Sequence, residues 1–192
     1  MPPEEQQERP SDVALLVASS SGDKAAFEEF VDRHKAALFR FTCAISSSPS
    51  EAEEAMQQTF VSAWLHASTF RGDGQARSWL YRIARNAQNK MHRRHVGEPA
   101  EHEEISELGN LAGWDRGFPP LSDVIENREW VQQSLASLPM DDQEILVLIE
   151  IEGFSLREAG ETLELSVAAT KSRLHRARLR LLAALRKDQD HA

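Results

Sequence analysis

The sequence has little cysteine, no long apolar run and no stretch in which polar and apolar residues alternate. Its single cysteine, Cys43, has no partner for an intramolecular disulfide. The longest apolar runs are far too short to cross a bilayer. The first ten residues, MPPEEQQERP, are acidic and proline-rich, whereas a secretory signal is basic and then apolar. We therefore expect a cytoplasmic protein with no membrane insertion.

Helical signals fill most of the chain, and we expect an all-α fold because no period-two pattern competes with them. Ser11 or Asp12 is a candidate cap for the first helix, and Ser48 precedes Pro49 and Glu51 as in a capping box. The first expected helix covers about residues 11–18, and the second opens at 22–23 and extends beyond 41. The others cover about 49–66, 75–95, 122–138, 141–152, 155–163 and 166–187.

Residues 96–121 differ from the rest of the chain, because they are rich in glutamate, glycine and proline and lack sustained periodicity. This composition is typical of a flexible linker. The sequence thus predicts two small helical domains, 11–95 and 122–187, on an acidic tether.

Charge is distributed unevenly, although the formal net charge is −9. Residues 71–95 hold seven Lys/Arg and one acid, and residues 171–187 hold seven Lys/Arg and no acid. Acids dominate 98–129 and 141–164. This segregation indicates two separate surfaces for polyanions, with an acidic body between them.

The second basic stretch lies in a pattern that has helix-turn-helix spacing. Residues 155–163 form a short helix that opens with a capping box, Glu164-Leu165 is a tight connection, and Ser166 caps a long helix. The apolar face of the short helix is expected to pack on that of the long one, which comprises Val167, Thr170, Leu174, Ala177, Leu181 and Leu185.

The N-terminal half of the second helix of such a motif enters the major groove. Base edges are then the expected targets of Ala168, Ala169, Ser172, Arg173 and Arg176. Phosphates are the expected targets of Lys171, His175 and Arg178. The alternative is a basic helix face that is merely solvated.

The segment from Leu138 to Leu148, with Glu152-Gly153-Phe154-Ser155 and the run from Thr170 to Arg178, resembles region 4 of the extracytoplasmic-function sigma factors. The resemblance implies that the second helix reads the minus-thirty-five promoter element. Ala159, Thr162 and Glu164 depart from the pattern, in which a glycine is usual at the turn. A left-handed glutamate at that turn costs on the order of 1 kcal/mol.

The helix expected at 49–66 is amphipathic, and taken alone its polar face is as expected for a solvated surface. The helix is similar to sigma region 2.2, which docks on the clamp of core RNA polymerase. The resemblance implies a polymerase-binding patch with an apolar contact, made of Glu51, Glu53, Glu54, Gln57, Gln58 and Phe60.

The run from Phe70 to Asn86 places a glycine-containing loop before a basic helix. This suits a strand whose bases leave the stack, because the backbone approaches closely while cations hold the phosphates. The run resembles sigma regions 2.3 and 2.4. The resemblance implies recognition of the minus-ten element by Arg71, Gly72, Asp73, Arg77, Arg82, Arg85 and Asn86.

These patterns together favour a sigma factor that binds core RNA polymerase and promoter DNA, is controlled by an anti-sigma factor, and needs no cofactor or metal. One alternative is a free-standing helix-turn-helix regulator with an N-terminal sensor or dimerisation domain. Another is an enzyme built on a metal cluster of His92, His95, Glu98, Glu101 and His102. No nucleophile, phosphate loop or paired-acid motif supports the enzyme, and no cysteine joins the histidines.

Overall fold

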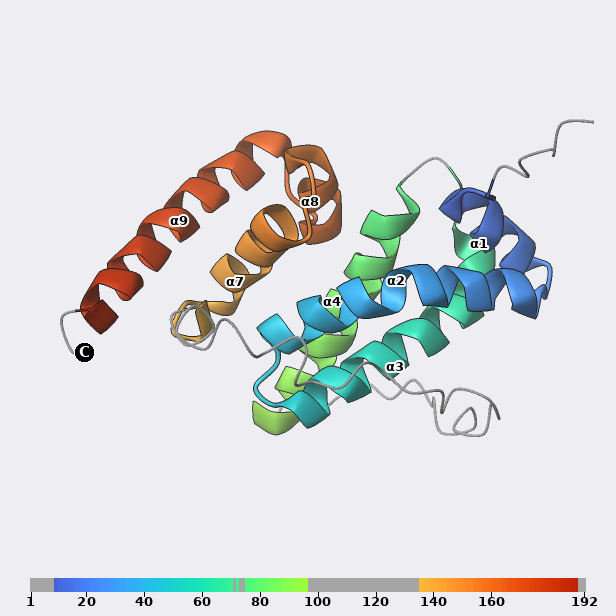
Figure 1. Cartoon of the computed structure of the whole chain (residues 1–192), viewed down its shortest axis with the longest axis horizontal. Coiled ribbons are helices and arrows are strands. Elements are labelled where there is room, and N and C mark those ends of the chain that lie inside the picture. Colours follow the sequence, from blue (N-terminus) through green and yellow to red (C-terminus); the bar gives the residue numbers. More distant parts are fainter. Residues whose placement is uncertain (1–8, 71, 73–74, 97–134, 190–192) are drawn as a thin grey trace, which may run out of the picture.

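The computed structural model describes residues 9–70, 72, 75–96 and 135–189, and every regular element in these ranges is helical. Figure 1 shows two groups of helices. The N-terminal helices are α1 (Asp12–Ser20), α2 (Lys24–Ile45), α3 (Pro49–His66), the short 3₁₀ helix η1 (Ala67–Thr69) and α4 (Ala76–Val96). The C-terminal helices are α7 (Met140–Leu146), the π-helical turn η2 (Val147–Ile151), α8 (Leu156–Leu163) and α9 (Val167–Gln189). The all-α expectation is confirmed, whereas the expected linker and most of the helix at 122–138 lie outside the described residues.

Side-chain caps fix where the N-terminal helices begin. Ser11 Oγ accepts from the backbone N–H of Ala14 at 3.2 Å, so Ser11 rather than Asp12 caps α1. Ser48 Oγ accepts from the N–H of Glu51 at 3.3 Å, and Pro49 opens α3 as expected. The second half of that capping box differs, because the Glu51 carboxylate accepts from the N–H of Ser47 instead of Ser48.

Helices α1 to α4 enclose an apolar core. Leu16, Phe30, Leu38, Met56 and Leu80 contribute to it, and each is fully buried. Burying a large apolar side chain contributes about 1.5–3 kcal/mol, so this core accounts for much of the stability of the N-terminal helices.

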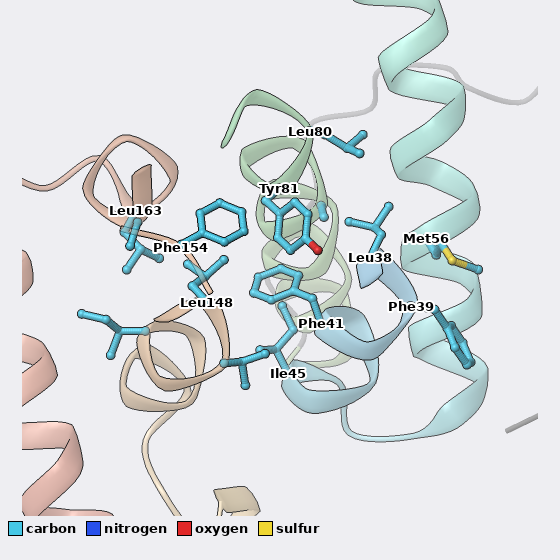
Figure 2. Packing of buried hydrophobic residues seen from close by; sticks show 14 of the residues in the cluster. Leu38, Phe39, Phe41, Ile45, Met56, Leu80, Tyr81, Leu148, Phe154 and Leu163 are labelled. Carbon is cyan, nitrogen blue, oxygen red and sulfur yellow. The ribbon is translucent and has the colours of Figure 1, made fainter. Parts of the chain in front are cut away.

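The apolar core continues from the N-terminal helices into the C-terminal ones. Helix α4 packs on α8, and α2 packs on α7. The Tyr81 ring lies 5.0 Å from that of Phe41 and 4.9 Å from that of Phe154, measured between centroids. Figure 2 shows Phe154 and Leu148 beside Tyr81, Phe41 and Ile45. The two groups therefore share an interface, which the prediction of two tethered domains did not include.

Helices α8 and α9 form the expected helix-turn-helix. The capping box at its start is confirmed, since Ser155 Oγ accepts from the Glu158 N–H and the Glu158 carboxylate accepts from the Ser155 N–H. Ser166 Oγ accepts from the N–H of Ala169 at 3.2 Å, as expected of the cap of α9. Both helix starts are thus set by residues within one turn of them.

The turn between α8 and α9 places a glutamate in the left-handed region, with Glu164 at φ 58° and ψ 41°. Gly160 lies close beneath this turn, and its carbonyl accepts from the Leu165 N–H at 2.8 Å. A Cβ at Gly160 would lie 2.9 Å from both the Leu165 carbonyl oxygen and Thr170 Oγ1. The glycine needed for close packing is therefore in α8, while the turn itself carries the strained residue.

The expected inner face of α9 is confirmed at Thr170, Leu174 and Ala177, which are buried. The prediction was wrong for Val167, which is 52% exposed. Val167 is the first residue of α9. Leu181 is half-buried, and the side chain of Leu185 lies outside the described part of the chain.

Glu164→Gly is expected to raise the free energy of unfolding by about 1 kcal/mol, because glycine adopts the left-handed conformation without strain. Urea denaturation followed by circular dichroism measures the change. Glu164→Ala is the matched control, since it removes the side chain but keeps the Cβ that causes the strain. Equal effects of the two substitutions would show that the backbone conformation at residue 164 costs nothing.

Candidate polymerase and nucleic-acid interfaces

Helix α3 presents acidic and amide side chains along one side. Glu53, Glu54 and Gln57 are exposed, and Glu51 and Gln58 are half-buried. Gln58 Nε2 donates to Glu54 Oε1 at 2.9 Å, which orders two of these side chains on the surface. The five polar residues predicted for polymerase docking thus lie together on one helix.

Phe60 was included in that predicted patch and does not belong to its surface. Its side chain is 1% exposed and forms part of the core of the N-terminal helices. In α3 it lies on the same side as Met56 and Ala63, which are also buried. An exposed apolar contact on α3 must come from another residue, and Leu65, which is 44% exposed, is the large apolar side chain of α3 that meets this condition.

The predicted minus-ten residues fall into two sets in the structure. Asn86 is exposed, Arg82 is half-buried, and Gly72 is exposed with φ +73°, a conformation that favours glycine. Arg77 and Arg85 contact the C-terminal helices instead. Arg71 and Asp73 lie outside the described residues.

Arg77 is held at the interface by Glu152, whose side chain is only 1% exposed. The guanidinium donates to the backbone carbonyl of Glu152 and lies 3.6 Å from its carboxylate. It also stacks 4.1 Å from the centroid of the Phe154 ring, a cation–π contact. The same carboxylate accepts from Arg40 Nε at 3.0 Å and from the Tyr81 hydroxyl at 3.2 Å.

Arg85 is held in the same way by Glu144, with 2.9 Å between Arg85 Nε and Glu144 Oε2. The Glu144 side chain is 1% exposed, and burial raises the pKa of this carboxyl above its ordinary value while the adjacent Arg85 opposes the rise. Burial likewise raises the pKa of the Tyr81 hydroxyl, which keeps it protonated as a donor to Glu152. Two buried carboxylates of the C-terminal helices thus depend on arginines of the N-terminal helices.

Sequence reasoning missed Arg40, Tyr81, Glu144 and Glu152 as members of a site. Glu152 is separated from Arg40 by 112 positions, and Glu144 from Arg85 by 59. The only signal was the acidic character of residues 141–164 beside two basic stretches. That pattern indicates complementary charge, and it does not identify the pairs.

Helix α9 presents most of its predicted DNA-binding residues to solvent. The exposed ones are Ala168, Ala169, Lys171, Ser172, His175, Arg176 and Arg178. Arg173 is half-buried and lies 3.3 Å from the Asp141 carboxylate, whereas Arg178 pairs with Glu150 at the surface. Arg180, which was not among the predicted DNA-binding residues, pairs with the buried carboxylate of Asp142. Acidic residues of α7 and η2 therefore form ion pairs with three arginines of α9.

No group of three His, Cys, Asp or Glu side chains suited to a metal occurs in the described part of the chain. The suggested cluster around His92 lies mostly outside it, and His92 itself is exposed. Burial raises the pKa of the half-buried Cys43 thiol to about 11, which keeps the thiol in its less reactive protonated form. Among the described helices, none is long and apolar enough to cross a bilayer.

Two family models match the chain, one on each group of helices. The model described as Sigma-70 region 2 matches residues 30–98, and that described as Sigma-70, region 4 matches residues 128–181. A similar protein is the ECF RNA polymerase sigma factor SigM of Mycobacterium tuberculosis, 31% identical over 176 residues that cover 91% of this chain and 85% of SigM.

The RNA polymerase sigma factor CnrH of Cupriavidus metallidurans is 33% identical over 187 residues, covering 94% of this chain and 97% of CnrH. A solved structure of CnrH with the cytosolic domain of CnrY matches 92% of this chain and 98% of its own, with a TM-score of 0.70 and 29% identity. The sigma factor RpoE of Bartonella quintana, solved with the anti-sigma factor NepR, gives a TM-score of 0.61 at 28% identity and covers 83% and 96% of the two chains.

Arg180→Ala is expected to lower the free energy of unfolding by about 1–3 kcal/mol, because it leaves the buried Asp142 carboxylate without its cation. Arg176→Ala is the matched control, since the Arg176 side chain is exposed and its loss is expected to cost less than about 0.5 kcal/mol. Urea denaturation of both variants measures the difference. A large loss with Arg176→Ala would show that this arginine supports the fold.

Proposed function

Because the chain belongs to the extracytoplasmic-function sigma factors of the sigma-70 family, we propose that three of its helices divide the work of directing core RNA polymerase to promoters. The observation that carries the proposal is the pair of surfaces exposed in one chain: the acidic side of α3 and the basic N-terminal half of α9. Members of this family are transcription initiation factors, so the chain is assigned no catalytic reaction of its own.

The polymerase-docking surface is assigned to α3. Glu51, Glu53, Glu54, Gln57 and Gln58 would meet basic or polar residues of the clamp, because carboxylates and amides pair with such partners. Electrostatic pairing of this kind sets the register and the rate of association more than the affinity. The apolar component is assigned to Leu65, which is exposed, in place of the buried Phe60.

The minus-ten element is assigned to α4 and the loop before it. Arg77, Arg82 and Arg85 would contact phosphates, Asn86 would contact the strand next to them, and Gly72 would let the backbone approach an unstacked base. Arg71 and Asp73, which lie outside the described residues, are assigned to this set from the sequence alone. The two arginines now bound to Glu144 and Glu152 must leave these carboxylates before they take part.

The minus-thirty-five element is assigned to α9, whose N-terminal half is exposed and lies beyond a capped, tight turn. Arg176, Ser172 and Arg173 would address base edges, with Ala168 and Ala169 close to the groove floor. Lys171, His175 and Arg178 would bind phosphates, which position the helix without reading sequence. Arg173 would first exchange the Asp141 carboxylate for DNA.

Control by an anti-sigma factor is the regulation we assign, in the cytoplasm where promoter DNA lies. Its support is the similarity to a sigma factor solved in complex with an anti-sigma factor, at a TM-score of 0.61. Neither domain needs to bind DNA tightly alone, because core polymerase would hold both near their half-sites and combine two weak contacts.

Gel shifts with and without core polymerase separate this function from that of a free-standing helix-turn-helix regulator. Promoter fragments come from transcript start sites mapped after overexpression of the chain. We expect a specific complex only when core is present, and Arg176→Ala should weaken it at least about tenfold while core binding is unchanged, since a base contact is worth about 1–3 kcal/mol. Lys24→Ala, an exposed lysine at the start of α2, is the control. Tight specific binding by the chain alone would contradict a sigma function.

Glu53→Lys combined with Glu54→Lys is expected to weaken binding to core polymerase at least about tenfold, because like charges would face the clamp. Both carboxylates are exposed, so the fold should be retained, which circular dichroism checks. Fluorescence anisotropy of the labelled chain titrated with core measures the affinity. The control is Glu161→Lys on α8; an equal loss with that variant would show that net charge, and not α3, determines the affinity.

A further inference from the structure

The interface between the N-terminal and C-terminal helices is built around carboxylates bound to arginines. Glu152 binds Arg40 and Arg77 and accepts a hydrogen bond from the Tyr81 hydroxyl, and Glu144 binds Arg85. Both glutamate side chains are 1% exposed, and Arg85 is 18% exposed. These three arginines come from α2 and α4, whereas Glu144 belongs to α7 and Glu152 directly follows η2.

The same contacts cover one side of α4. Ser78 is 4% exposed and its hydroxyl donates to the backbone carbonyl of Glu158 at 3.3 Å. The Arg77 guanidinium lies over the Phe154 ring, 4.1 Å from its centroid, and 5.7 Å from the centroid of Tyr81, in cation–π contacts. A DNA strand and the C-terminal helices would therefore occupy the same side of α4.

We propose that Glu144 and Glu152 hold the chain in a closed form, in which their carboxylates take the places of DNA phosphates on Arg85 and Arg77. The minus-ten surface then becomes available only after the two groups of helices separate. The inference rests on the assignment of these arginines to DNA binding. It adds a form of regulation that needs no second protein.

Because the carboxylates are buried, the interface between the two groups of helices is sensitive to the loss of any arginine partner. A buried ion pair gains little over two hydrated charges, but a buried charge that loses its partner is strongly disfavoured. At an interface between two domains, the unpaired carboxylate escapes by separation of the domains, which returns it to water. The closed form thus requires every pair to be made, and an anion that binds the arginines favours the open form.

Substitution of Arg40 distinguishes opening of the closed form from a simple effect of net charge on DNA binding. It binds Glu152 but belongs to α2 and is not among the residues assigned to DNA. Glu152→Gln makes the chain less negative and Arg40→Gln makes it more negative. A closed form held by this pair opens in both variants, whereas nonspecific attraction to DNA changes in opposite directions.

Fluorescence energy transfer measures closure in the full chain without DNA or polymerase. Dyes are attached through Ser68→Cys and Ala183→Cys, at exposed positions of η1 and α9, in a Cys43→Ala background. Arg85→Glu or Glu144→Arg alone should lower the transfer efficiency, and the double exchange should restore it because the pair is re-formed with opposite polarity. Glu161→Gln, in an exposed pair with Arg157 within α8, should change nothing.

The second measurement is the affinity of the lone chain for a labelled single-stranded oligonucleotide of mixed sequence. Glu152→Gln and Arg40→Gln should each raise it by about threefold or more, because the binding-competent fraction rises. Glu161→Gln is again the control, because it removes one negative charge from an ion pair that lies within α8.

The outcomes distinguish the inference from the proposed function. Low transfer in the unaltered chain, or no recovery in the double exchange, overturns the closed form even if the polymerase assays succeed. Reduced transfer with a raised affinity in both Glu152→Gln and Arg40→Gln supports it. Reduced transfer without a raised affinity overturns the blocking of α4, and a gain in Glu152→Gln with a loss in Arg40→Gln attributes the effect to net charge. Failure of the sigma function would appear separately, as tight promoter binding that needs no core polymerase.

Discussion

The arrangement of the two helical groups depends on one buried carboxylate, that of Glu152. Three donors from the N-terminal helices, on Arg40, Arg77 and Tyr81, converge on this residue. A carboxylate buried to this degree is tolerated only when charge-assisted hydrogen bonds replace its water. Glu152 is therefore stable where it lies only if α2 and α4 lie against it, and this requirement fixes how the groups meet.

The backbone conformation around Glu152 places this residue at the interface between the two groups of helices. The π-helical turn η2 ends there, with the Glu152 N–H donating to the Val147 carbonyl at 2.9 Å. Gly153 follows at φ +68°, and this left-handed residue turns the chain so that Phe154 packs on Tyr81 and Arg77. Ser155 then caps α8. The interface and the first helix of the helix-turn-helix are thus positioned by adjacent residues of one short segment.

Features determined by neighbouring residues were predicted well from the sequence. Ser155 and Ser166 cap their helices as expected, because a cap requires only a side chain and an N–H three residues away. Phe60 was assigned to the polymerase-binding patch through the resemblance and not through the periodicity of its helix. The misplacement of Val167 has a different cause. The periodicity of one helix gives the centre of its apolar face, but the width of that face depends on which helices cover it. The pairs of Glu144 and Glu152 have no local signature at all, since their partners are distant in the chain.

The segregated acidic and basic residues of the sequence pair with one another in the folded chain. Residues 141–164 were interpreted as an acidic body between two basic surfaces. In the structure these acids are counterions: Asp141, Asp142 and Glu150 bind arginines of α9, whereas Glu144 and Glu152 bind those of α4 and α2.

One acidic segment thus neutralises part of each basic surface while DNA is absent. Phosphates must displace carboxylates at each such arginine, so the free energy of DNA binding is reduced by the cost of breaking these pairs. A chain of net charge −9 with two basic surfaces would then bind DNA weakly alone, and the contacts made by polymerase would supply the difference.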